Sequence, residues 1–147
     1  MNADRKETVR GLAHAAITVR DMEGSLKFYQ VVFGAKKIMD IEEPKGTPLI
    51  EYLQFPDGTC LELFYPRKET PLGHQLGRNH LAFYTDDMEA CYKRLCEYQV
   101  AVPAPPKTAR DGNRQLWCTD PNGYQVELIE YVEGCPQRKP QEIRHLS

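Results

Sequence analysis

Two histidines and two glutamates follow one another in a repeated order along this chain of 147 residues: His14, Glu62, His80 and Glu127. Each Glu has Leu or Val on both sides, so it lies within a strand-like run rather than at a solvated tip. An unpaired carboxylate is costly to bury, and a divalent metal is one possible partner. Two imidazoles and two carboxylates form a mixed nitrogen and oxygen donor set that suits borderline first-row cations. The alternative is that each Glu faces water and each His is a hydrogen-bonded core residue.

An internal repeat relates the two His and Glu pairs. The segment 14–23 (HAAITVRDME) aligns with 80–89 (HLAFYTDDME) at an offset of 66 residues, and 56–63 (PDGTCLEL) aligns with 121–128 (PNGYQVEL) at an offset of 65. Each half therefore has a His in its first strand and a Glu in its last strand. Because all four residues occupy equivalent positions of a repeat, the metal site is favoured over the alternative.

The elements that position these residues are predicted in the order β-α-β-β-β, twice. In the first half, strand patterns span 12–19, 37–41, 49–55 and 60–65, and apolar residues recur at helical spacing at Met22, Leu26, Tyr29 and Phe33. In the second half, strand patterns span 79–84, 100–103, 114–119 and 125–131, and the helical spacing is that of Met88, Tyr92, Leu95 and Tyr98. Asp-Gly at 57–58 and Asn-Gly at 122–123 predict a hairpin between the last two strands of each half.

The repeat predicts an α+β fold of two βαβββ modules, at residues 11–66 and 78–132. A linker at 67–77 joins them, with a flexible N-terminus at 1–10 and a C-terminal tail at 133–147. Each module is too small to bury a generous core alone, so the two must pack together or across a dimer.

Composition and charge argue against several partners. The chain is 41% hydrophobic and 27% charged, with a net charge of -2 and no long block of like charges, so nucleic acid is a poor candidate. No apolar run is long enough to cross a bilayer, and the first nine residues do not resemble a signal peptide, so we expect a cytoplasmic protein without a membrane partner. The five cysteines form no CxxC pair and are expected to be reduced.

Four motifs together resemble the vicinal oxygen chelate superfamily, which includes glyoxalase I, methylmalonyl-CoA epimerase, bleomycin and fosfomycin resistance proteins and extradiol dioxygenases. They are HAAITVRDMEGSLKFY (14–29), CLELF (60–64), NHLAFYTDDMEA (79–90) and DPNGYQVELIE (120–130). The resemblance covers about residues 11–131. It implies curved mixed sheets around a metal site, commonly in a homodimer, in which His14, Glu62, His80 and Glu127 bind one divalent cation (Ni, Co, Zn, Mn or Fe).

The His-Glu-His-Glu pattern resembles that of the glyoxalase I branch of lyases and isomerases or epimerases. The metal would then bind a small carbonyl substrate and stabilise the enediolate formed when a proton leaves the adjacent carbon. By family analogy the base is Glu127, with Glu62 as its quasi-symmetric alternative, and the repeat alone does not choose between them. Thr18 and Pro66 stand where glyoxalase I enzymes typically carry the Arg and Asn that bind glutathione, which argues against glutathione as cosubstrate.

Residues that the two halves do not share are the candidates for substrate binding: Tyr65, Arg67, Arg78, Arg110 and Arg114. Arg suits a substrate carboxylate or phosphate, and the alternative for each is a solvated surface residue. Trp117 is interpreted as core or dimer packing. Two other functions stay open: a metal-dependent dioxygenase, whose Fe(II) is typically held by two His and one carboxylate, and a metal-free small-molecule-binding or resistance protein of the same fold.

Overall fold

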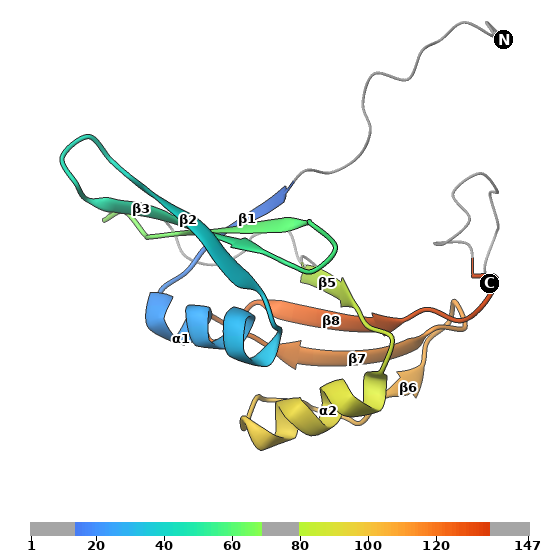
Figure 1. The fold of residues 1–147 in the computed structure, drawn as a ribbon. Coiled ribbons are helices and arrows are strands. Elements are labelled where there is room, and N and C mark those ends of the chain that lie inside the picture. Colours follow the sequence, from blue (N-terminus) through green and yellow to red (C-terminus); the bar gives the residue numbers. More distant parts are fainter. Residues whose placement is uncertain (1–13, 69–79, 136–147) are drawn as a thin grey trace, which may run out of the picture.

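A computed structural model describes residues 14–68 and 80–135, and the order β-α-β-β-β is confirmed in each half (Figure 1). The first module contains the strands β1 (His14–Thr18), β2 (Lys36–Glu42), β3 (Pro48–Gln54) and β4 (Cys60–Phe64). The second contains β5 (His80–Tyr84), β6 (Lys107–Thr108), β7 (Arg114–Thr119) and β8 (Gln125–Glu130). The helices are α1 (Met22–Leu26), its continuation η1 (Lys27–Val32), and α2 (Met88–Glu97).

Parts of the predicted organisation lie outside the described residues. They are the N-terminus at 1–10, most of the linker at 67–77, and the C-terminal tail from residue 136. Within the described ranges, no helix is both long and apolar enough to cross a membrane.

Each module forms one mixed four-stranded sheet, which confirms the α+β fold class. The strand orders are β1-β4-β3-β2 and β5-β8-β7-β6. In both sheets the first strand pairs in parallel with the last, and the other pairs are antiparallel. The parallel pairing sets Ala16 opposite Glu62 and Ala82 opposite Glu127, so each Glu lies beside the first strand of its module.

Aspartates begin both helices. The carboxylate of Asp21 accepts a hydrogen bond from the backbone N–H of Gly24 at 2.9 Å, and that of Asp87 accepts one from Ala90 at 3.0 Å. The first helix then widens to a π-helix, in which the N–H of Phe33 bonds to the carbonyl five residues earlier at 3.1 Å. This change of helical register was not predicted, since the apolar spacing indicates only one continuous helix.

The strand predicted at 100–103 is wrong. The N–H of Val100 bonds to the carbonyl of Leu95 at 3.0 Å, in the turn that follows α2. The short strand β6 forms later, at Lys107–Thr108. Proline lacks the N–H that a sheet ladder needs. Pro103 is the last residue of the predicted strand, and Pro105 and Pro106 lie between it and β6.

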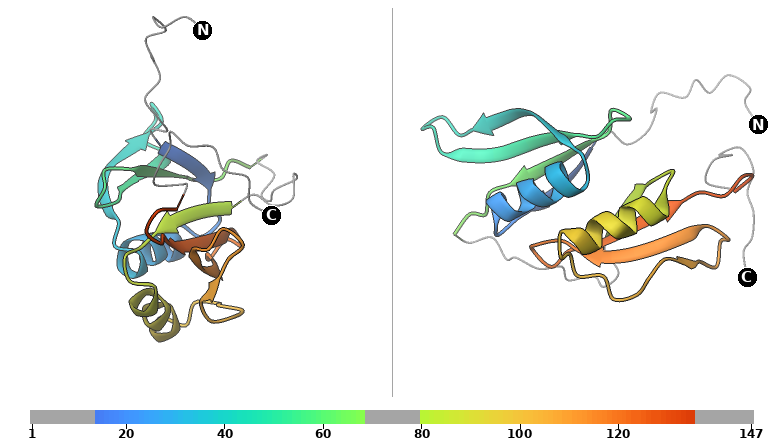
Figure 2. Two further views of the ribbon diagram at one scale, coloured as in Figure 1. Left: turned by 90° about the vertical axis from the view of Figure 1, so that its right-hand side faces the viewer. Right: turned by 60° about the horizontal axis from the view of Figure 1, so that its bottom comes forward.

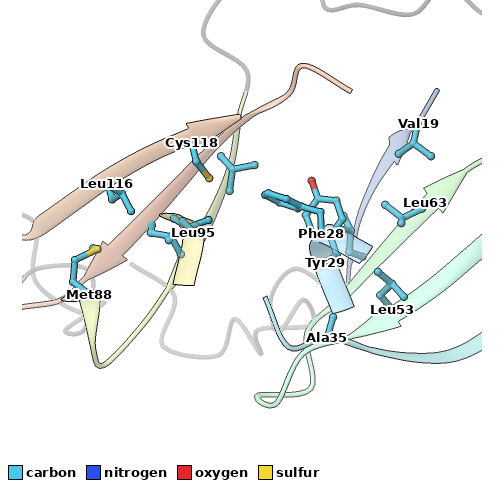
Figure 3. Close-up of a cluster of buried hydrophobic side chains, with 13 residues drawn as sticks. Val19, Phe28, Tyr29, Ala35, Leu53, Leu63, Met88, Leu95, Leu116 and Cys118 are labelled. Carbon is cyan, nitrogen blue, oxygen red and sulfur yellow. The ribbon is translucent and has the colours of Figure 1, made fainter. Parts of the chain in front are cut away.

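One face of each sheet carries the helix of its own module, and we call it the helix face (Figure 2). The buried core lies on the helix faces and includes Val19, Phe28, Tyr29, Leu53, Leu63, Met88, Leu95, Leu116 and Cys118 (Figure 3). We call the opposite face of each sheet the open face, because large apolar side chains there stay exposed. Met39 is 46% exposed, and Tyr84 is 46% exposed.

The hairpin turn between β7 and β8 of the second module contacts the residues just before α1 of the first module. The side-chain oxygen of Asn122 accepts hydrogen bonds from the backbone N–H groups of Arg20 at 2.8 Å and Asp21 at 3.3 Å. Beneath it, the buried hydroxyl of Tyr29 donates to the carboxylate of Asp120 at 2.9 Å. Tyr124 adds a bond to the carbonyl of Thr18 at 2.8 Å. The two modules are therefore joined by polar contacts as well as by their common core.

Candidate functional site

In the first module, the imidazole of His14 faces the carboxylate of Glu62. His14 Nε2 lies 3.4 Å from Glu62 Oε2, because the parallel register of β1 and β4 sets both side chains on the open face. The Glu62 side chain is only 13% exposed. The other ring nitrogen, Nδ1, lies 3.3 Å from the hydroxyl of Tyr52, which is directly opposite Glu62 on β3. A histidine that binds a metal usually has such an oxygen at its second nitrogen, which orients the ring.

The environment of Tyr52 keeps its hydroxyl protonated. Burial raises the pKa of Tyr52, and the nearby Cys60 and Glu62 raise it further. A protonated phenol can donate or accept a hydrogen bond, so it can support either tautomer of His14.

The second module repeats this arrangement with different supporting residues. His80 Nε2 lies 3.1 Å from Glu127 Oε2, and the Glu127 side chain is 13% exposed. Trp117, directly opposite Glu127 on β7, packs edge-on against His80 with ring centroids 4.9 Å apart. Trp117 therefore lies on the open face and not in the core of the single chain. The amide of Gln115 donates to Glu127 Oε1 at 2.6 Å.

The two pairs do not converge within one chain. Among residues 14–68 and 80–135, no three His, Cys, Asp or Glu side chains lie close enough together to hold a metal ion. Each pair offers one imidazole nitrogen and one carboxylate oxygen, which is half of the expected ligand set. We call each His and Glu pair a half-site. The donor types fit a divalent cation of the first transition row, but the expected four donors are present only when two half-sites come together.

Tyr65 and Arg67 make their contacts away from the two pairs. Tyr65 donates to Glu51 Oε1 at 2.9 Å on the helix face of the first sheet, opposite to the face that carries Glu62. Lys37 Nζ lies 2.6 Å from the other oxygen of Glu51, and the hydrogen bond with Glu51 is the main reason why the pKa of Lys37 is raised. Arg67 forms an ion pair with Glu43 at 3.0 Å.

Of the second-module candidates, Arg114 also points away from the open face. Arg114 alternates with Gln115 and therefore points to the helix face, where it pairs with Glu89 of α2 at 2.7 Å. Arg110 is exposed in the turn before β7. Arg78 lies outside the described residues. The structure thus brings together each His with its Glu, but it brings none of the described substrate candidates to either pair.

A cavity of about 510 Å³ lies between the two modules. Its walls are mainly apolar and include Phe33, Phe55, Leu61, Phe83, Leu95 and Leu128. His14 lies at this cavity, but the cavity is not lined by Glu62, His80 or Glu127. It is therefore not a common pocket for the two His and Glu pairs.

Sequence reasoning missed Tyr52 and Gln115, although a signal for both was present. The Asp-Gly and Asn-Gly turns set the register of the two hairpins, and the alternation of side chains along a strand then selects the neighbours of each Glu. This reasoning sets Tyr52 opposite Glu62. It also sets Trp117 opposite Glu127, and Gln115, two residues before Trp117 on the same strand, has its side chain on the same face.

Comparison with known proteins identifies the family. The model of the Glyoxalase/Bleomycin resistance protein/Dioxygenase superfamily matches residues 11–128. The chain belongs to this superfamily. The predicted resemblance is thereby confirmed, and the two mixed-sheet modules are those of the superfamily fold.

Relatives within the superfamily carry the names of different enzymes. The chain is 28% identical over 156 residues to a 2-epi-5-epi-valiolone epimerase of an Actinomyces species, covering 89% of this chain and 85% of the relative. It is 27% identical over 123 residues to a lactoylglutathione lyase of Haemophilus influenzae, covering 81% and 91%. The solved structure of the trypanothione-dependent glyoxalase I of Leishmania major matches with a TM-score of 0.70 and 25% identity, covering 90% of this chain and 94% of that one.

Proposed function

We propose that this protein is a homodimeric, divalent-metal-dependent lyase or isomerase that moves a proton next to the carbonyl of a small substrate. In the proposed dimer, the open face of the first module of one subunit meets the open face of the second module of the other. One metal site then consists of His14 and Glu62 from one chain and His80 and Glu127 from the partner subunit.

The observation that carries this proposal is the separation of two matched half-sites. Each His faces its Glu through equivalent atoms, Nε2 and Oε2, at 3.4 Å in the first module and 3.1 Å in the second. A second module of another chain supplies the missing half without any change in fold. Exposed apolar side chains on the open face, such as Met39 and Ile41, support an interface there, because apolar patches of this kind mark interaction surfaces.

Metal binding, orientation of the imidazole rings and proton transfer are assigned to different residues of the chain. When bound, a divalent cation supplies Lewis-acid stabilisation of the negative charge that develops on a substrate carbonyl oxygen. His14 and His80 would hold the cation through Nε2, and the contacts of Tyr52 with His14 and of Trp117 with His80 would orient the rings. One of the two carboxylates, Glu127 by resemblance to glyoxalase I or Glu62 as its counterpart, takes the proton from the carbon next to the carbonyl and can return it to a neighbouring position.

The names of the relatives support this reaction class. An epimerase and a lactoylglutathione lyase are both among them. Because Thr18 and Pro66 replace the expected glutathione-binding residues, we favour a substrate that is not a glutathione adduct.

The test is a screen for exchange of the proton next to the carbonyl in deuterated water. Purified protein is loaded with Ni²⁺, Co²⁺, Mn²⁺ or Zn²⁺ and is given hydroxy-ketones, keto-sugars, 2-oxoaldehyde hemithioacetals and acyl-CoA esters. We expect NMR-detected exchange with one of these classes, and its loss in Glu127→Gln while the fold stays intact. Undiminished exchange in this variant would remove Glu127 from the role of base.

The same preparation separates the proposed enzyme from the two alternatives. A protein that binds none of these metals would be a small-molecule-binding protein of the same fold. Oxygen consumption with Fe(II) and a catechol, in place of proton exchange, would indicate a dioxygenase.

A further inference from the structure

The two carboxylates of the proposed metal site differ in their hydrogen bonding. Glu127 has both oxygens engaged, with Oε1 accepting from the Gln115 amide at 2.6 Å and Oε2 lying 3.1 Å from His80 Nε2. Glu62 has only Oε2 engaged, at 3.4 Å from His14 Nε2, and the described part of the chain gives its Oε1 no side-chain donor. The two halves of the repeat therefore supply the same types of ligand. Within the described residues, however, an amide side chain donates a hydrogen bond to Glu127 and none donates to Glu62.

A single side chain accounts for this difference. Gln115 pairs in register with Ile129, and Ile50 pairs in register with Phe64. Phe64 and Ile129 are equivalent in the repeat, so Ile50 is the first-module counterpart of Gln115. Where the second module has an amide that reaches its Glu, the first module has an aliphatic side chain that cannot donate a hydrogen bond.

The hydrogen bond of Gln115 restricts the Glu127 carboxylate to one orientation. A carboxylate rotates about its terminal bond and can offer either oxygen, or both, to a cation. With Oε1 held at 2.6 Å in a setting where the side chain is only 13% exposed, little water is present to compete for that oxygen, and Oε2 is the atom left to point at His80. Replacing a residue that hydrogen-bonds to a metal ligand is known to change the affinity of the site for the metal.

We propose that Gln115 is a positioning residue, which fixes Glu127 as a one-oxygen ligand and thereby makes the two Glu ligands inequivalent. Glu127 is the anchored carboxylate, and Glu62, without such a donor, is the carboxylate free to turn at the site. This inference rests on the proposed function, since it concerns the same site.

The test compares Co²⁺ binding by the full-length protein and by Gln115→Met. Methionine retains the length of the side chain and removes the amide donor. The matched control is Gln30→Met, since Gln30 lies on η1, and its side-chain oxygen accepts a hydrogen bond from the Lys37 backbone N–H, away from both open faces. Calorimetric titration with Co²⁺ should give at least about 10-fold weaker binding for Gln115→Met and a change within about twofold for Gln30→Met.

A second variant and a second readout guard against a general loss of structure. Gln115→Ile introduces the residue that the chain itself carries at position 50, in a strand that favours branched side chains. It should weaken Co²⁺ binding as Gln115→Met does. Both variants should also change the visible absorption of bound Co²⁺, because Glu127 is then free to offer a second oxygen and raise the coordination number.

The outcomes separate this inference from the proposed function. If the unaltered protein binds no Co²⁺, the proposed function fails, and the role of Gln115 fails with it. If the unaltered protein binds Co²⁺ and both Gln115 variants bind it equally tightly with the same spectrum, only the role of Gln115 is overturned.

Discussion

Replacing Tyr29 by Phe tests whether the polar contact between the modules stabilises the fold that carries the two half-sites. Tyr29 is fully buried, and its hydroxyl donates to Asp120, which is 4% exposed. Three other donors remain for that carboxylate: the backbone N–H groups of Asn122 and Tyr124, and the Asn122 side-chain amide. Removing one of four donors to a buried charged group places the loss at the lower end of the usual range, about 1.5–2 kcal/mol.

The assay is urea unfolding of the metal-free protein, followed by the fluorescence of its single tryptophan. In a thermal scan of the same protein, a loss of about 2 kcal/mol should lower the Tm of a chain of this length by about 4–8 °C. Tyr98→Phe is the matched control, because Tyr98 is 40% exposed and its ring, which lies 5.6 Å from the guanidinium of Arg94, is retained. It should change the unfolding free energy by less than about 0.5 kcal/mol.

The pH dependence provides a second check on Tyr29. Burial, followed by the negative charge of Asp120, raises the pKa of Tyr29 well above 10. Above about pH 10 an unfolded tyrosine ionises, whereas the folded one stays protonated, so the folded state binds more protons and the unfolding free energy falls as the pH rises. Tyr29→Phe has no hydroxyl to ionise at this position. The difference in unfolding free energy between the unaltered protein and the variant should therefore become smaller above pH 10. Equal stability of Tyr29→Phe and Tyr98→Phe, or a constant deficit from pH 7 to 11, would refute the reasoning.

Three further predictions concern ligand linkage, thiol chemistry and helix packing. Co²⁺ at about 100 times its Kd should raise the unfolding free energy by about 2.7 kcal/mol, and a thermal scan without any shift would contradict binding to the native state. Burial raises the pKa of Cys118 to about 12, so iodoacetamide at about pH 8 should modify the exposed Cys96 and spare Cys118 in the native protein; equal labelling by peptide mapping would disagree. Arg94 donates to the carbonyls of Val32 and Val31 at 3.1 and 2.6 Å, so Arg94→Ala should cost about 1–2 kcal/mol in urea unfolding, and an unchanged midpoint would be inconsistent.

The sequence was most informative where the repeat and the turn chemistry agreed. The matched segments around His14 and His80 predicted the order of elements, and the Asp-Gly and Asn-Gly turns predicted the two hairpins. The parallel registers of β1 with β4 and of β5 with β8, which set each His on the same face as its Glu, come from the structure. The predictions of element order and of the hairpins depend on local geometry, which a single sequence records well.

Inference from sequence was weaker where partners come from other elements. Arg114 was a plausible substrate ligand, but its partner Glu89 lies on α2, and no local pattern indicates that contact. The strand at 100–103 was predicted from its apolar residues. The prolines at its end and after it disfavour a strand there, because they cannot donate a ladder hydrogen bond. The separation of the two half-sites depends on how the modules pack, through contacts such as that between Tyr29 and Asp120, which are 91 residues apart in the chain.

The most direct test of the central claim is metal binding by a mixed dimer. One chain carries His14→Ala and Glu62→Gln, the other carries His80→Ala and Glu127→Gln, and the mixed dimer is purified with two different affinity tags. If each site takes one pair from each subunit, one of the two sites in the mixed dimer is intact. The account predicts one tightly bound Co²⁺ per mixed dimer by calorimetry and none in either parent dimer. A mixed dimer that binds no Co²⁺, while the unaltered protein binds it, would contradict a site shared between subunits.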